Sequence, residues 1–211
     1  MTLPGKADRT RGQLPGVDSC GTDSGGSSRP LRADARRNRE AILRAAREAF
    51  EAEGVLTSLD GIAARAGVGN ATLYRNFPTR DDLLAVVMQD SITEALAEAD
   101  ELSRTLTPRA ALREWLVLLT WRLRIWHDLP YCLASAHEDT TSPVQSACNP
   151  LLQRTGDLLA RADVSGETPG TISAEEVYEL VLALSWAVDR FGDDEVTTRR
   201  RVGIATAGIL A

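Results

Sequence analysis

The sequence contains 211 residues, of which 43% are hydrophobic and 26% are charged, and its formal net charge is −6. This composition is typical of an ordinary globular protein with one large domain or two small ones. No uninterrupted apolar run is long enough to cross a bilayer, and residues 1–28 lack the apolar segment of a signal peptide. We therefore expect a cytoplasmic protein without a membrane-spanning segment.

The cysteines and histidines give no sign of a disulfide framework or a metal site. Cys20, Cys132 and Cys148 are odd in number and form no C-x-x-C pair, which favours reduced thiols. His127 and His137 lie ten residues apart, with no zinc-ligand spacing around them. We expect neither a metal nor a cofactor.

Charge is distributed unevenly along the chain. Residues 29–80 hold ten arginines against six acidic side chains, a balance of +4, whereas residues 86–211 hold eleven basic and nineteen acidic side chains, a balance of −8. A basic front and an acidic back favour two separate roles in one chain. Chance clustering of charges is the alternative.

The chain begins with a segment that shows no helical or strand pattern. Residues 1–28 are rich in Gly, Ser and Pro, so we expect a disordered tail over residues 1–30. From Leu31 apolar residues recur at helical spacing, and Glu53-Gly54 predicts the end of that helix. Five arginines precede or open the helix and indicate either a flexible arm on DNA or a solvated basic end: Arg29, Arg32, Arg36, Arg37 and Arg39.

Two short helices follow. Ser58 is placed to cap a helix of about two turns that Gly67 closes, and a second helix covers about residues 70–76 before Phe77-Pro78 breaks it. So short a connection predicts a helix-turn-helix with a steep crossing angle. The second helix leaves an outer face that suits a DNA major groove: Asn70, Ala71, Thr72, Tyr74, Arg75 and Asn76. On this pattern alone, a tight helical hairpin without DNA contacts remains an equal alternative.

The rest of the chain also has helical periodicity. Thr79 is placed to cap one long helix through Leu96, and Thr107-Pro108 opens an apolar helix over residues 108–126 that suits the centre of a bundle. A helix over residues 143–162 is expected to be interrupted at Asn149-Pro150. A capping box at residues 173–176 opens a helix to about Phe191, and a last helix covers about residues 194–210. Since no strand pattern appears, we predict an all-α fold.

The stretches REAILRAAREAFEAEG and TSLDGIAARAGVGNATLYRNFPTRDDLL closely resemble the DNA-binding domain of the TetR family of transcriptional regulators, over about Arg36 to Leu84. The resemblance implies a three-helix helix-turn-helix DNA-binding domain at residues 31–80 and a helical ligand-binding and dimerisation domain at residues 81–211. Gly69 departs from the family, which often has serine or threonine there. The positions that carry the resemblance are Ile62, Ala63, Ala66, Gly67, Val68, Thr72, Leu73, Tyr74, Phe77, Leu83 and Leu84.

The resemblance also implies roles for individual residues. In that family, the positions of Thr72, Tyr74 and Arg80 hold phosphates, while those of Asn70, Ala71 and Arg75 lie where base edges are read. We expect the DNA contacts to come from Arg36, Arg37, Ser58, Asn70, Ala71, Thr72, Tyr74, Arg75, Asn76 and Arg80.

The C-terminal part resembles the family in helical layout, and weakly resembles a subgroup with a Pro-x-x-Ala-Leu-Arg-x-Trp-Leu segment, here residues 108–116. The family binds a small molecule in this part. Thr120 and Arg122 interrupt the apolar helix and could orient a ligand, or equally satisfy a backbone carbonyl or a neighbouring acid. The candidate pocket residues are Trp115, Leu119, Thr120, Arg122, Trp126 and Cys148.

The last two helices carry an apolar or small-residue stripe that predicts a homodimer. A face that a monomer would leave in water would be buried in an isologous interface. The candidate interface residues are Leu180, Leu184, Val188, Gly203 and Ala207.

These features predict a ligand-responsive, sequence-specific DNA-binding regulator, a repressor released by a small molecule. Its expected partners are double-stranded operator DNA, a second copy of the chain and an unidentified effector. A DNA-binding activator or architectural protein without a ligand is the alternative. An enzyme that carries a helix-turn-helix is disfavoured, because the sequence shows no recognisable nucleophile, metal or acid-pair constellation.

Overall fold

The computed structural model describes residues 28–137, 139–164 and 172–209, and these residues form an all-α fold without strands, as predicted. The expected tail lies outside the described residues except for its last three, which open the first helix. The helices are α1 (Ser28–Glu53), α2 (Leu59–Arg65), α3 (Asn70–Asn76), α4 (Arg80–Val87), α5 (Gln89–Thr105), α6 (Pro108–Leu123), α7 (Leu129–His137), α8 (Pro143–Val164), α9 (Ala174–Phe191) and α10 (Glu195–Ala205).

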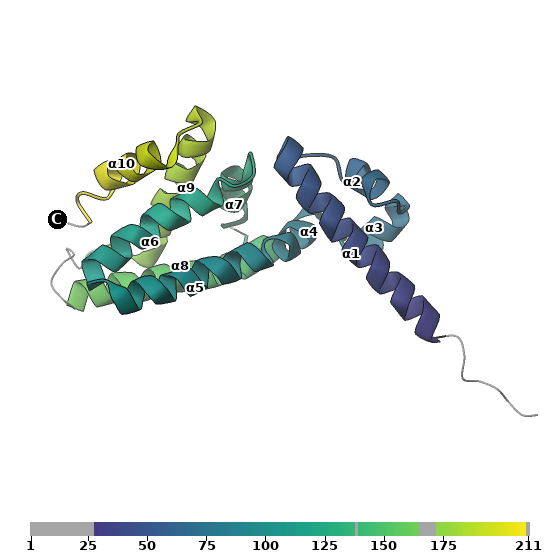
Figure 1. Ribbon diagram of the computed structural model, residues 1–211, viewed down its shortest axis with the longest axis horizontal. Coiled ribbons are helices and arrows are strands. Elements are labelled where there is room, and N and C mark those ends of the chain that lie inside the picture. The colour runs from purple at the N-terminus through teal and green to yellow at the C-terminus, as the bar shows by residue number, and fades with distance from the viewer. Residues whose placement is uncertain (1–27, 138, 165–171, 210–211) are drawn as a thin grey trace, which may run out of the picture.

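The helices form two groups joined by α4. Figure 1 shows α1, α2 and α3 together at one end of the molecule, while α5 to α10 form an elongated bundle beside them. Helix α4 contacts α1 on one side and α8 on the other. None of the described helices is both long enough and apolar enough to cross a membrane.

The helix-turn-helix forms through the predicted local signals. The Ser58 hydroxyl accepts a hydrogen bond from the Gly61 N–H and caps α2. Gly67 adopts the left-handed conformation, with φ of +67°, that closes α2 and turns the chain toward α3. The side chains of Ile62, Ala63 and Leu73 are fully buried, so the two helices pack closely over α1.

One long helix was predicted after Thr79, and this prediction is wrong. The chain bends at Met88, which separates α4 from α5. No proline or glycine marks the bend in the sequence. The neighbours differ on the two sides of Met88, because α4 packs on α1 and α8 while α5 packs on α6 and α8.

Three further boundaries differ from the prediction. Helix α6 ends at Leu123 rather than Trp126, and the following turn leads into the unpredicted α7. Helix α8 continues through Pro150, so the expected interruption is absent. Helix α10 ends at Ala205, ahead of the expected end at Leu210, which lies outside the described residues. The predicted caps at Thr79, Thr107, Ser173 and Gly192 are confirmed.

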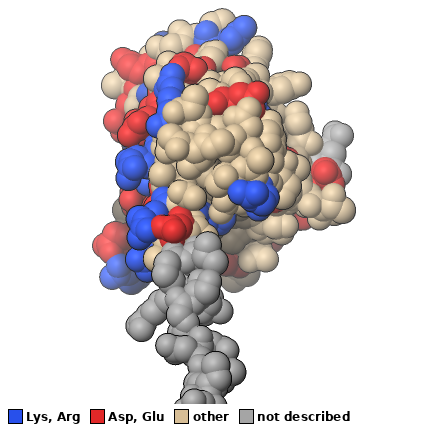
Figure 2. Space-filling model, turned by 90° about the vertical axis from the view of Figure 1, so that its right-hand side faces the viewer, with Lys and Arg blue, Asp and Glu red and all other residues tan. Residues whose placement is uncertain are grey.

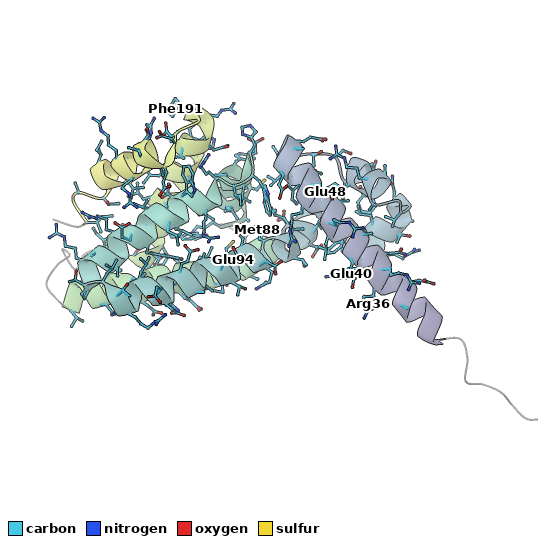
Figure 3. The ribbon with its side chains drawn as sticks, viewed as in Figure 1. Arg36, Glu40, Glu48, Met88, Glu94 and Phe191 are labelled. Atoms are coloured by element: carbon cyan, nitrogen blue, oxygen red, sulfur yellow. The ribbon has the colours of Figure 1, made fainter. Side chains whose placement is uncertain are left out.

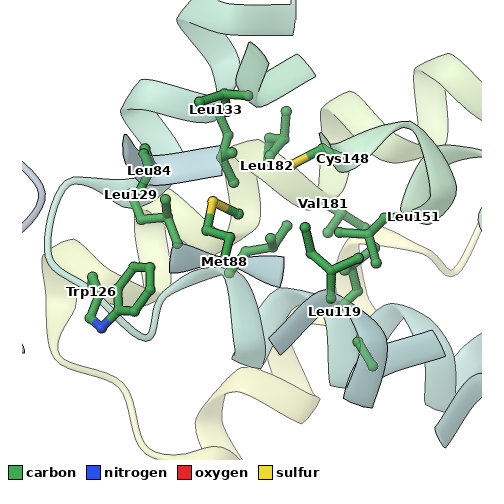
Figure 4. Close-up of a cluster of buried hydrophobic side chains, with 14 of the residues drawn as sticks. Leu84, Met88, Leu119, Trp126, Leu129, Leu133, Cys148, Leu151, Val181 and Leu182 are labelled. Carbon is green, nitrogen blue, oxygen red and sulfur yellow. The ribbon is translucent and has the colours of Figure 1, made fainter. Parts of the chain in front are cut away.

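The bundle is built around α6, as its apolar sequence predicted. This helix contacts α5, α8, α9 and α10. The Trp115 indole N–H donates to Thr155 Oγ1 at 2.9 Å, and the Thr120 hydroxyl donates to the Leu116 carbonyl at 2.7 Å. Both buried polar groups are therefore satisfied within the chain. Figure 4 shows Met88 in the middle of the adjoining apolar cluster, among side chains from α4, α6, α7, α8 and α9.

The two groups of helices meet at the turn between α6 and α7. The Val55 N–H donates to the His127 carbonyl oxygen at 3.0 Å, and the rings of Phe50 and Trp126 pack with their centroids 5.6 Å apart. A side chain at Gly54 would place its Cβ 2.9 Å from the His127 oxygen. The junction is thus a close backbone contact with a buried aromatic pair.

Candidate nucleic-acid interface

Helix α3 presents its outer face to solvent. The side chains of Asn70, Ala71, Tyr74 and Arg75 are exposed. Figure 2 faces the end of the molecule that carries α1, α2 and α3, and shows a broad, mostly uncharged surface with charged side chains of both signs gathered along its left side. A short exposed helix with small and amide side chains at its leading end suits insertion into a major groove.

Side chains of α3 are held in place by bonds within the helix. Arg75 Nη2 donates to Thr72 Oγ1 at 2.9 Å, and Asn76 Nδ2 donates to the Thr72 carbonyl at 2.8 Å. The Tyr74 hydroxyl lies 3.5 Å from Asp60 Oδ1 on α2. Thr72 and Asn76 are half-buried. Asn70 and Arg75 are exposed, and Arg75 has to give up its bond to Thr72 to reach a base edge.

The start of α3 lacks a side-chain cap. Gly69 occupies the N-cap position with an extended backbone, φ of −72°, and no side-chain hydrogen bond. A Cβ added there would meet no atom within 4 Å. The glycine is therefore not required by backbone geometry or by space.

The remaining candidates for DNA contacts lie outside α3 and differ in how far their side chains are exposed. Arg80 is half-buried and its guanidinium donates to the Val55 carbonyl, so it ties α4 to the turn before α2. Arg36 and Arg37 lie on the exposed first half of α1 and pair with Glu40 and Asp34 respectively. Figure 3 shows Arg36 and Glu40 on this half of α1. These arginines belong to a helix and not to a flexible arm.

Arg39 has a structural position that the sequence analysis missed. Its guanidinium carbon lies 4.4 Å from the centroid of the Phe77 ring, and its Nη1 donates to the Asn76 carbonyl at 3.4 Å. The side chain thus clamps α1 onto the end of α3. Because Arg39 and Phe77 lie far apart in the sequence, no local pattern signals this contact.

The candidate pocket residues fall into two groups. Leu119, Arg122 and Trp126 line a cavity of about 20 Å³ at the bend beside Met88. Trp115, Thr120 and Cys148 do not line it. Burial raises the pKa of the Cys148 thiol to about 12, which makes this thiol unreactive at neutral pH.

Arg122 and Trp126 differ in how their polar atoms are satisfied. Arg122 pairs with Glu94 at 3.3 Å and also with Glu98, both on α5. The Trp126 indole N–H is buried and has no acceptor among the described residues. Of the two, Trp126 has the donor that a bound molecule could satisfy.

Helices α9 and α10 expose large apolar side chains. Phe191 and Ile204 are 67% and 69% exposed, and Trp186 and Val196 are also exposed. Figure 3 shows Phe191 at the tip of α9. Among the predicted interface residues, Gly203 and Ala207 are exposed and Leu180 and Leu184 are half-buried, but Val188 is fully buried within its own chain and does not face outward.

An exposed recognition helix on a helix-turn-helix, joined to a separate helical bundle, defines a DNA-binding regulator. Residues 42–87 match the model of bacterial regulatory proteins of the tetR family. Residues 107–211 match the model of the C-terminal domain of SbtR-like transcriptional regulators. The chain belongs to the TetR family of transcriptional regulators.

Individual relatives agree with this assignment. An HTH-type transcriptional regulator of Staphylococcus aureus is 42% identical over 60 residues, which are 28% of this chain and 32% of that protein, so the match spans about a third of the relative. The crystal structure of a TetR transcriptional regulator from Streptomyces coelicolor is 25% identical with a TM-score of 0.53, covering 82% of this chain and 98% of that one. FadR from Bacillus subtilis, in complex with stearoyl-CoA, is 17% identical with a TM-score of 0.58, covering 81% and 98%, which shows a shared fold.

Proposed function

We propose that the protein is a homodimeric, cytoplasmic repressor that binds a specific DNA operator and leaves it when a small molecule binds. The observation that carries this proposal is the outer face of α3, where Asn70, Ala71, Tyr74 and Arg75 are exposed on a helix-turn-helix. In a major groove, Asn70 and Arg75 offer donors to base edges and Ala71 offers an apolar contact.

Phosphate contacts hold the helix in register. The groups offered to phosphates all have internal partners in this structure. They belong to Ser58, Thr72, Tyr74 and Arg80. A phosphate replaces such a partner with a charge-assisted bond of greater strength. Arg36 and Arg37 offer two further guanidinium groups on α1, where their exposed ion pairs are weak.

Dimerisation supplies the two-fold symmetry of the operator. The exposed side chains of Trp186, Phe191, Val196 and Ile204 on α9 and α10 give a partner an apolar surface to bury. Paired with a second copy, these helices would form an isologous interface. Two copies of α3 would then read half-sites about one helical turn, roughly 34 Å, apart.

Effector binding is proposed for the bundle beside the α4–α5 bend. The cavity of about 20 Å³ lined by Met88 and Trp126 has room for little more than one water, so a ligand has to displace side chains there. The unsatisfied Trp126 N–H would donate to such a ligand, and the Trp126 ring touches Phe50 of α1. FadR of Bacillus subtilis, which shares the fold, holds stearoyl-CoA. A ligand releases DNA only if it prefers the conformation that binds DNA poorly.

A DNA-binding regulator without an effector is the second candidate. It is favoured by the filled bundle, where the cavity beside Trp126 holds about 20 Å³ and that beside Tyr178 about 10 Å³. The larger hollows described are surface grooves between helices.

The two candidates differ in one measurement. A compound library is screened for changes in tryptophan emission, and each binder is titrated into a complex of the full-length chain with labelled operator DNA. The repressor proposal expects at least one compound that shifts the emission and weakens DNA binding over the same concentration range. If every binder leaves the DNA affinity unchanged, the effector-free candidate replaces it.

A further inference from the structure

Three side chains that can ligate a metal meet at the junction between the two groups of helices. His127 and Asp128 lie in the turn between α6 and α7, and Asp189 lies near the end of α9. One ring nitrogen of His127 and one carboxylate oxygen from each aspartate lie within 4.8 Å of one another. Among the described residues, this is the only group of three or more His, Cys, Asp or Glu side chains that are so close.

The distances between the His127 and aspartate atoms are close to those between two ligand atoms of one metal ion. His127 Nδ1 lies 3.1 Å from Asp189 Oδ2, and His127 Nε2 lies 3.7 Å from Asp128 Oδ2. The ligand atoms of a tetrahedral Zn²⁺ lie roughly 3.3–3.6 Å apart when each is about 2.0–2.2 Å from the ion. The His127 and Asp189 atoms already have about that separation. Asp128 faces the other ring nitrogen, so its side chain, which is 31% exposed, has to change rotamer to reach an ion held by His127 Nδ1 and Asp189.

The chemistry of the three side chains indicates which metal ion they would bind. One imidazole and two carboxylates are a set that Zn²⁺ accepts, with the fourth position left to water. Mg²⁺ and Ca²⁺ prefer oxygen ligands alone, so the imidazole disfavours them. The two carboxylates beside one imidazole also concentrate negative charge that a divalent cation neutralises.

The surroundings hold the ligands in place. The Asp128 N–H donates to Asp189 Oδ2 at 3.4 Å, which fixes the Asp189 carboxylate against the turn. The Asp189 side chain is only 12% exposed. The His127 backbone carbonyl separately accepts from the Val55 N–H, so the same residue contacts the DNA-binding end of the chain. Such outer contacts orient metal ligands and tune their affinity.

We infer that His127, Asp128 and Asp189 form a binding site for one Zn²⁺ ion per chain. The ion fastens α9 to the turn between α6 and α7, and through the His127 carbonyl it stabilises the contact with the turn before α2. A protonated His127 bridging the two carboxylates would make similar contacts without a metal. Titration with Zn²⁺ separates these two arrangements.

The test uses full-length protein without a histidine tag, freed of metal by chelation. Calorimetric titration with ZnCl₂ should give one ion per chain, and saturating Zn²⁺ should raise the midpoint of thermal unfolding. His127→Gln and Asp189→Asn should each weaken Zn²⁺ binding at least about tenfold and remove the thermal shift. The same concentration of MgCl₂ should produce no shift.

The chain supplies a matched control, because it contains only two histidines. His137→Gln removes the other, which lies 3.6 Å from Glu179, and should leave Zn²⁺ binding unchanged. Absence of saturable Zn²⁺ binding would overturn the inference, as would equal binding by His127→Gln or an equal effect of Mg²⁺. His127 meets Val55 through its backbone, so His127→Gln keeps that contact, and Asp128→Asn is a second variant should one fail to fold. No DNA is used, so the result is independent of the proposed repressor function.

Discussion

Gly54 shows how one residue sets the approach of the two groups of helices. Its φ of +85° lies in the left-handed region, and an added Cβ would lie 2.9 Å from the His127 carbonyl oxygen and 3.1 Å from the His127 Cβ. A side chain here would meet both a strained backbone and a filled space. Gly61 in α2 has neither constraint, since a Cβ there would lie 3.8 Å from its nearest neighbour and its φ is not positive.

Gly54→Ala should therefore lower the free energy of unfolding by about 1–3 kcal/mol, because the junction has to open to admit the methyl group. Gly61→Ala is the matched control and should raise it by about 0.5–1 kcal/mol through helix propensity. Urea denaturation of the two variants measures both changes. Equal effects of the same sign would show that the close approach at His127 has no energetic role.

Gly69 offers a prediction of the opposite sign. Gly69→Ser should supply the missing hydroxyl cap of α3 and raise the free energy of unfolding by about 0.5–1 kcal/mol, since space and backbone geometry both permit the side chain. Urea denaturation measures this gain, with Gly69→Ala as the control that lacks the hydroxyl. If serine gains nothing over alanine, the hydroxyl does not cap α3.

The proposed DNA contacts divide into phosphate and base contacts, and the division can be measured. Arg80→Ala and Tyr74→Phe should weaken binding to all DNA sequences alike, and each lost phosphate contact should reduce the salt slope by about one. Arg75→Ala should instead relax the preference between sequences, at a cost of about 1–3 kcal/mol on the best site. Arg104→Ala, an exposed arginine on α5 far from α3, is the control. An unchanged salt slope for Arg80→Ala would contradict the phosphate role.

At the scale of the helices, local signals predicted most of the fold, and tertiary contacts decided the rest. Ser58, Thr79, Thr107 and Ser173 all cap the helices that they were predicted to cap. The bend at Met88 carries no such local signal. It coincides with a change of neighbours between α4 and α5, which a single sequence does not reveal.

The candidate site divides in the same way. The exposed residues of α3 follow from helical periodicity and the resemblance, so sequence alone could nominate them. The clamp by Arg39 on Phe77 and the meeting of His127 with Asp189 join positions far apart in the chain. Spacing rules apply to neighbouring positions and miss such pairs. Periodicity also does not tell a dimer interface from the core of the same chain: Val188 was predicted to lie in the interface but is buried within its own chain.

Helix α8 gives a prediction at this scale, because it continues through Pro150. Proline in a helix interior lacks the N–H that would bond to the preceding turn, and it destabilises the helix by about 3 kcal/mol relative to alanine. Its rigid ring also lowers the conformational entropy of the unfolded chain, which stabilises the folded state by about 0.4–1 kcal/mol. Pro150→Ala should therefore raise the free energy of unfolding by about 2 kcal/mol in urea denaturation. A loss of stability would indicate that a bend at Pro150 is needed for packing.

At the scale of the whole molecule, the α6–α7 turn connects the bundle with the DNA-binding end. Trp126 packs on Phe50, and His127 bonds to Val55 through its backbone and contacts Asp189 of α9 through its ring. A change in the bundle or in the proposed dimer helix therefore has a short physical route to α1 and α2. The proposed release of DNA by an effector requires such a route, because a ligand acts by biasing the relative position of the two parts.

Selection of bound DNA from a random pool by the full-length chain tests the central claim most directly. The account predicts an enriched, two-fold symmetric motif whose half-site centres lie about one helical turn apart, because the proposed dimer presents two copies of α3. The same selection with Arg75→Ala should lose preference at positions within each half-site. Enrichment of no motif, or of one unaffected by changes in α3, would contradict the account.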